Sequence, residues 1–246
     1  MQTFPAVRVF LIALQFLTRI PTPAMTAPTP SELSRAALFY PIVGLLIGAL
    51  MLVTAGLLAN QDPMLVAALL LGMWVMLTGA LHLDGLADSA DAWLGGQGNP
   101  QRTHEILKDP LVGTAGVVAI FLVLLFKYIA LYSLLKQHNY IIVLLAPVLG
   151  RSFILLLFTS TDYVRKQGLA SDVVAGLNGR AALLGLLLVL LISLWYAPFA
   201  VIAIVLSFIA LRRLMIQRLG GCTGDTAGAS VEITEAIWLF CAALFY

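Results

Sequence analysis

Charged residues are scarce in this sequence, and cysteine is scarcer still. Only 11% of the 246 residues are Asp, Glu, Lys or Arg, and the net charge is +2. A nucleic-acid-binding surface needs a basic patch, which is missing here. The two cysteines, Cys222 and Cys241, lie about 28 Å apart if one helix carries both, which is too far for a disulfide. The composition therefore argues against a nucleic-acid partner and against a disulfide framework.

Several familiar catalytic signatures are missing as well. The sequence has no Walker loop, no zinc-ligand spacing and no Ser-His-Asp signature. His104 and His138 show no ligand spacing, whereas His82 lies two residues before an aspartate. His82 is therefore a candidate general base, or alternatively a polar cap at a membrane interface.

Apolar residues are abundant. They make up 61% of the chain, and the mean hydropathy is +1.00. A span takes about 20 apolar residues, so we expect an all-α polytopic membrane bundle of seven or eight spans, forming a single domain over residues 1–246. The uncertain run is Val7–Ile20, which is either a short span or a helix in the interface. The others are Ala36–Ala59, Met64–Leu83, Leu111–Leu135, Tyr140–Ser160, Ala181–Trp195, Pro198–Ile216 and Thr226–Tyr246.

The loops between these runs are alternately short and charged. Alternate loops of a serial bundle share one side of the membrane, and ten of the fourteen basic residues fall on or beside the charged side. Only Arg8 and Lys136 clearly border the other side. Because cytoplasmic loops are rich in Lys and Arg, the charged side is predicted to be cytoplasmic. The ten are Arg19, Arg35, Arg102, Lys108, Arg165, Lys166, Arg180, Arg212, Arg213 and Arg218.

Three aspartates follow the Met64–Leu83 run, in the stretch LHLDGLADSADAW. If this stretch is helical, Asp84, Asp88 and Asp91 project within one narrow arc. Like charges so close repel each other, and aspartate oxygens suit Mg²⁺, Mn²⁺ or Ca²⁺ better than zinc. Mg²⁺ commonly shares its shell with substrate phosphate, so the pattern favours phosphoryl transfer. The alternative is a solvated acidic turn at the end of a span.

A second polar cluster, RTHEILKDPLVG, precedes the next run. Arg102 and Lys108 are basic, and Gly113 and Gly116 open the following helix. Basic side chains and a glycine-led helix start suit an anionic phosphate. The alternative is an amphipathic surface segment with ordinary cytoplasmic charge.

The third cluster, GGCTGDTAGASVEITEA, places acids inside the last span. Glu232 and Glu235 lie about 9 and 14 Å deep by the helical rise, and Arg151 lies about 14 Å deep on its own span. Since an unpaired charge at such depth is costly, Arg151 is predicted to pair with one of these glutamates. Lys127 is a poorer partner by depth and is predicted to reach the far interface instead.

These motifs, in this order, resemble the cobalamin-5′-phosphate synthases, also called adenosylcobinamide-GDP ribazoletransferases. The HLDGLAD element is highly specific to that family, and the resemblance runs from end to end. Its parts are FLTRIPTP, FYPIVGLLIG at 39–48, HLDGLADSADAW at 82–93, the KD…G…G segment at 108–116, Gly150-Arg151, and TGDTAGASVEITE at 223–235.

The resemblance implies a reaction, a cofactor and a location. A hydroxyl of α-ribazole, or of its 5′-phosphate, attacks the corrinoid-side phosphorus of adenosylcobinamide-GDP, and GMP leaves. Mg²⁺ is the implied cofactor. The implied location is the bacterial inner membrane, in contact with lipid, with the active site facing the cytoplasm. A homo-oligomer remains open.

The family's motifs carry roles onto particular residues. The metal ligands fall on Asp84, Asp88, Asp91 and Asp225. Asp88, Asp109 or His82 is expected to accept the proton of the attacking hydroxyl. A Ser-basic pair expected after Asp109 is replaced by Pro110 and Leu111, which makes Arg102 a candidate phosphate contact. The expected substrate contacts are Arg102, Lys108, Arg151 and Gly224.

Two other classes remain open. A CDP-alcohol-type lipid phosphotransferase has a similar DG…D…D pattern, but its fourth, more distant aspartate is missing here. A cation-coupled transporter could use the acids as an ion site, but it should carry acids or broken helices near the midplane of several spans. The clearest acid cluster here lies at one mouth.

Overall fold

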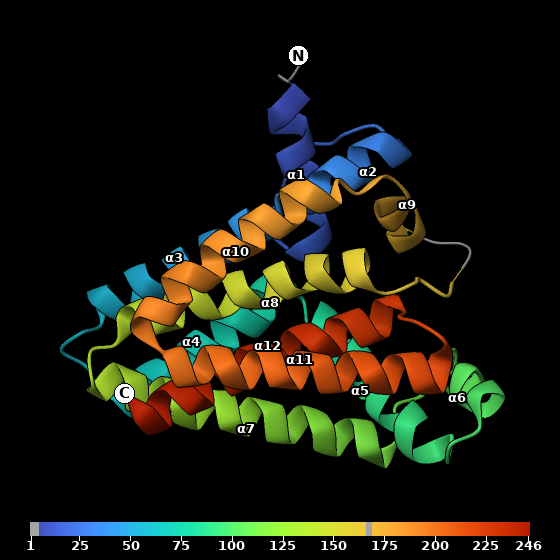
Figure 1. The fold of residues 1–246 in the computed structure, drawn as a ribbon. Coiled ribbons are helices and arrows are strands. Elements are labelled where there is room, and N and C mark those ends of the chain that lie inside the picture. The colour runs from blue at the N-terminus through green and yellow to red at the C-terminus, as the bar shows by residue number, and fades with distance from the viewer. Residues whose placement is uncertain (1–4, 166–168) are drawn as a thin grey trace.

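The computed structural model describes residues 5–165 and 169–246, and Lys166, one of the ten basic residues above, lies outside them. The secondary structure of the described part is helical, apart from one β-bridge between Tyr163 and Cys222. Figure 1 shows the arrangement of the helices. They are α1 (Pro5–Leu17), α2 (Pro30–Ala37), α3 (Tyr40–Leu57), α4 (Pro63–Thr78), α5 (Leu81–Gly95), α6 (Pro100–Ile106), α7 (Thr114–Lys136), α8 (Tyr140–Ser160), α9 (Leu169–Gly176), α10 (Gly179–Tyr196), α11 (Pro198–Leu219) and α12 (Gly224–Phe245).

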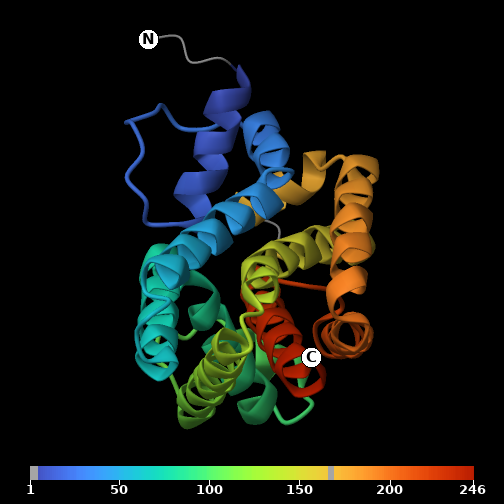
Figure 2. The same cartoon turned by 90° about the vertical axis from the view of Figure 1, so that its left-hand side faces the viewer.

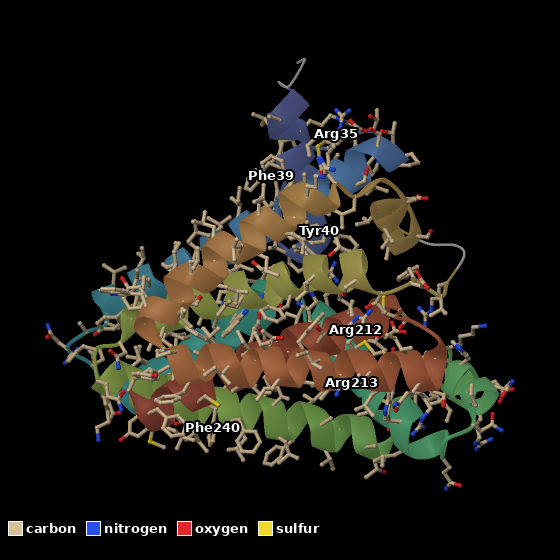
Figure 3. All side chains as sticks on the ribbon, viewed as in Figure 1. Arg35, Phe39, Tyr40, Arg212, Arg213 and Phe240 are labelled. Atoms are coloured by element: carbon tan, nitrogen blue, oxygen red, sulfur yellow. The ribbon has the colours of Figure 1, made fainter. Side chains whose placement is uncertain are left out.

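The long helices confirm a multi-pass membrane protein. Helices α3, α7, α8, α10, α11 and α12 are each long and apolar enough to cross a bilayer, and α4 with α5 makes a seventh span if the bent pair is counted as one. Helix α8 is the central one, because 83% of its most apolar stretch is buried, whereas most of the corresponding stretches of α7 and α10 are not buried. Nitrogen and oxygen atoms gather at the end where α5, α6 and the start of α12 meet (Figure 3). Exposed apolar surface on the outer helices is what contact with lipid requires.

The first helix does not have the length of a span. Helix α1 ends at Leu17 after 13 residues and runs across the direction of α7 and α11 (Figures 1 and 2). Arg8 Nε donates to Glu32 Oε1 of α2 at 2.6 Å, and this hydrogen bond is the main reason that the pKa of Glu32 falls to about 2. Arg8 is therefore joined to the first charged loop, and the expectation that it borders the opposite side was wrong. The pair fixes α1 against α2.

A sharp break separates α4 from the aspartate helix α5. The two helices meet at 87°, and both Gly79 (φ +61°) and Ala80 (φ +58°) adopt the left-handed conformation. Glycine takes this conformation readily, and the Arg19 side chain packs where a Cβ of residue 79 would lie. Arg19 N also donates to Leu77 O at 2.7 Å. The predicted span Met64–Leu83 therefore ends early, and the aspartates lie on a helix of their own.

Small residues let α5 and α12 approach each other closely. A Cβ on Gly85 would lie 2.7 Å from the carbonyl oxygen of Asp225, and one on Gly228 would lie 3.3 Å from the Cα of His82. Such contacts between backbones need glycine at the crossing point. The crossing brings the aspartate helix to the first turn of the last helix, which positions the candidate site.

Candidate functional site

The structure gathers the predicted carboxylates at one end of the bundle. Asp84 and Asp88 lie one turn apart on α5, and Asp225 lies in the first turn of α12, which packs on α5. The charges of Asp84, Asp225 and Asp91 all repel that of Asp88. The prediction that residues 84–91 are helical is confirmed. The result is a locally negative region that favours a cation or a proton.

Asp91 caps the N-terminus of α7. Its Oδ2 accepts from Gly113 N at 2.7 Å, and its Oδ1 accepts from Gly116 N at 2.9 Å. A Cβ on either glycine would meet this carboxylate. A carboxylate at a helix N-terminus satisfies free N–H groups and the helix dipole. The glycine-led helix start that suggested a phosphate site therefore holds Asp91 instead.

Asp225 has a partner that the sequence did not single out. Arg165 Nη2 donates to Asp225 Oδ2 at 2.5 Å and to Leu107 O at 3.1 Å. The segment that carries Arg165 is held beside the start of α12, because Val164 N donates to Cys222 O at 3.0 Å. The only signal in the sequence was that Arg165 belongs to a charged loop, and nothing local indicates which acid it meets.

The basic segment before α7 lies at the outer edge of this end of the bundle (Figure 1). Arg102, Lys108 and Asp109 are all exposed. Arg102 Nε donates to Gly95 O at 3.2 Å, next to the end of α5, and Asp109 Oδ1 accepts from Leu111 N at 3.0 Å in a local turn. These contacts are structural, and they do not bring the three residues to the carboxylates.

A cavity of about 190 Å³ lies beside the carboxylates. Its polar lining includes His82, Asp84 and Asp225, together with Gly224 at the start of α12. Its apolar lining comes from α1, α3, α8 and α9, with Leu81 of α5 and Ala227 of α12. Among the described residues, Asp88, Asp91 and Asp109 are not part of this lining. Four of the predicted site residues therefore meet at one cavity, and the others surround it or lie farther out.

Below this cavity, four charged side chains are buried together. Lys127 Nζ lies 2.6 Å from Glu232 Oε2 and 2.5 Å from Glu235 Oε2, and Arg151 forms an ion pair with Glu235. Lys127 is 3% exposed and also lies 4.4 Å from the ring centre of Trp74. The predicted pairing of Arg151 with Glu235 is confirmed, but the expectation for Lys127 was wrong. Depth along a helix does not determine the face, and α7 turns Lys127 toward α12.

Arg151 also determines what His82 can do. Arg151 Nη2 lies 3.5 Å from His82 Nδ1. Because a guanidinium only donates hydrogen bonds, a neutral His82 in this contact would accept at Nδ1 and carry its proton on Nε2. The expected role of His82 as general base stays a prediction. Arg151 is fully buried and is absent from the described lining of the cavity, and its expected contact with substrate stays a prediction.

The expected four-carboxylate metal site is not assembled. Within residues 5–165 and 169–246, no three His, Cys, Asp or Glu side chains are arranged to hold one metal ion. Asp91 binds the start of α7 and Asp225 binds Arg165. Mg²⁺ is usually held by only one or two carboxylates plus substrate phosphates. Asp84 and Asp88 therefore fit a Mg²⁺ ion that binds together with a phosphate-bearing substrate.

Comparison with known proteins gives the family. The model of the cobalamin-5-phosphate synthase family matches residues 9–243. An adenosylcobinamide-GDP ribazoletransferase of Stutzerimonas stutzeri is 50% identical and covers 92% of this chain and 93% of its own length. The enzyme of the same name from Pseudomonas savastanoi is 47% identical (96% and 98%), and that of Acinetobacter baumannii ACICU is 43% identical (94% and 95%). No solved structure matches. The chain therefore belongs to the cobalamin-5-phosphate synthase family of transferases.

Proposed function

We propose that this chain joins adenosylcobinamide-GDP to α-ribazole or its 5′-phosphate at the cytoplasmic face of a bacterial inner membrane. The hydroxyl oxygen of the acceptor forms a bond to the corrinoid-side phosphorus, and the bond from that phosphorus to the GMP oxygen breaks. The main support for the proposal is the cavity, whose lining combines His82, Asp84 and Asp225 with apolar side chains. The curated relatives named adenosylcobinamide-GDP ribazoletransferase support the choice of substrate.

The residues around the cavity have different proposed roles. Asp84 and Asp88 would hold Mg²⁺, which when bound would offset the negative charge of the diphosphate. Asp88 would be either the second ligand of this ion or, if it stays off the metal, the group that takes up the proton of the attacking hydroxyl. His82 donates a hydrogen bond to a phosphate or ribose oxygen. Arg165 holds Asp225 against the site until the substrate competes for it.

The proposal predicts which nucleotide the purified protein releases. In lipid vesicles, adenosylcobinamide-GDP with α-ribazole 5′-phosphate should yield GMP and the joined corrinoid in equal amounts, and chelation of Mg²⁺ with EDTA should stop both. CDP-activated alcohols should yield no CMP. Release of CMP would favour the lipid phosphotransferase, and cation flux without turnover would favour the transporter.

The membrane orientation makes a second prediction. Cys222 is fully buried, and burial raises the pKa of its thiol to about 12, so it is a poor topology probe. In a Cys222→Ser, Cys241→Ala background, Gln101→Cys on α6 should react with a membrane-impermeant maleimide only after the inner membrane is opened. Gln61→Cys, in the loop between α3 and α4, should react in intact spheroplasts. Both positions are exposed. The reverse pattern would place the charged loops outside.

A further inference from the structure

The size of the cavity limits which part of a substrate enters it. An apolar cavity of about 150 Å³ accepts benzene, and this one measures about 190 Å³. Pockets that bind drug-sized ligands measure about 300–1,000 Å³, and adenosylcobinamide-GDP is larger than most drugs. The corrinoid substrate therefore has to stay outside. A flat ring system slightly larger than benzene fits inside.

The walls of the cavity suit such a ring. Phe16 of α1 stacks on Tyr40 of α3, with ring centres 6.0 Å apart and planes at 16°. Phe158 of α8 lines another side and packs edge-on against Tyr163. Aromatic walls of this kind hold a flat aromatic ligand by stacking and edge contacts. Arg8 and Glu32 keep α1, and with it Phe16, in place.

Two polar groups in this apolar lining are available to a ligand. Tyr40 lies at the start of α3 (Figure 3), is 3% exposed and lines the cavity. Its hydroxyl makes no hydrogen bond to another described residue, and its oxygen is not among the buried unpartnered atoms of the described part, so it is accessible from the cavity. An accessible hydroxyl can donate to a ligand atom or accept from one. The second group is the imidazole of His82, which lines the cavity together with Asp84 and Asp225.

We propose that this cavity binds the aromatic base of the acceptor nucleoside, with its ribose directed toward Asp84 and Asp225. The inference rests on the proposed function, because it assigns one part of the proposed active site to the acceptor and the other part to adenosylcobinamide-GDP. The base lies against the walls that Phe16, Tyr40 and Phe158 form, with a ring nitrogen or an exocyclic group against the Tyr40 hydroxyl. The ribose hydroxyl then lies beside the carboxylates, where the diphosphate of the second substrate arrives from outside.

Filling the cavity tests the assignment. Ala170 of α9 lines the cavity, whereas Ala175 of the same helix is exposed. Ala170→Phe should raise both the KM and the Kd for α-ribazole 5′-phosphate by about tenfold or more, because it occupies the space of the ring. The KM for adenosylcobinamide-GDP should stay unchanged. Ala175→Phe should change neither constant. Kd is measured by the fluorescence of the base, without the second substrate.

A second variant covers the case in which Ala170→Phe fails to fold. Tyr40→Phe keeps the ring and removes the hydroxyl, and it should raise the Kd for α-ribazole 5′-phosphate about threefold to tenfold. Normal GMP release with an unchanged acceptor KM in both variants would overturn the cavity assignment and leave the proposed function standing. If both variants weaken acceptor binding, the cavity assignment is supported. This holds even if the parent protein releases no GMP and the proposed function is wrong.

Discussion

Asp84→Asn should reduce GMP release by about a thousandfold or more, which is the scale of losing a group that stabilises the transition state. Asp84 lines the cavity and is the predicted carboxylate best placed to meet a metal-bound phosphate. An amide keeps the shape of the side chain but not its charge. Asp84→Glu should also be poor, because Mg²⁺ demands near-ideal octahedral geometry. GMP release at saturating substrates and Mg²⁺, measured in vesicles, checks both variants.

Asp109→Asn is the matched control for this result. Asp109 is exposed and only accepts from Leu111 N in a local turn, so its amide variant should stay within about threefold of the parent. Near-normal turnover in Asp84→Asn would remove Asp84 from the site. A large loss in Asp109→Asn would restore the catalytic role that the family motif suggests for it.

Arg151→Met should destabilise the protein strongly, and Glu235→Gln should rescue part of the loss. In Arg151→Met, Lys127 is left with the two carboxylates of Glu232 and Glu235. In Glu235→Gln, the two cations Lys127 and Arg151 are left with the single carboxylate of Glu232. Each single change leaves an unbalanced buried charge, which costs about 3–5 kcal/mol. Together they leave Lys127 with Glu232, a balanced pair. Thermal unfolding in detergent should therefore show the double variant less destabilised than the sum, by about 1–3 kcal/mol.

The matching cycle replaces Arg151→Met with Lys127→Met. It should also couple to Glu235→Gln, because Lys127 contacts the same carboxylate. Purely additive losses in both cycles would mean that the four charges do not form one network. Arg151 would then have to be reconsidered as a direct contact of a substrate phosphate.

Hydropathy predicted the long helices well, because length and apolarity are local properties of the chain. The break at Gly79 and Ala80 was missed because it depends on packing against Arg19, which comes from a distant segment. The bend is nevertheless decisive, since it separates α5 from α4 and lets α5 pack against α12 and α7.

The candidate site was predictable as a set of residues but not as a set of contacts. The spacing of Asp84, Asp88 and Asp91 gives one helix face, yet it cannot show that Asp91 caps α7. Likewise, Arg165 reaches Asp225 only because its loop pairs with residue 222. The depth estimate identified Arg151 and Glu235 correctly and failed for Lys127, whose direction is set by helix packing.

The most direct test compares Asp84→Asn with Asp91→Asn, measuring GMP release per folded molecule alongside the melting temperature. We expect that Asp84→Asn melts like the parent and releases almost no GMP. Asp91→Asn should melt several degrees below the parent, because losing a helix cap has an effect of that size. Its turnover should stay within about tenfold of the parent. If Asp91→Asn melted normally and were inactive while Asp84→Asn turned over normally, the division of the aspartates into site and helix cap would be wrong.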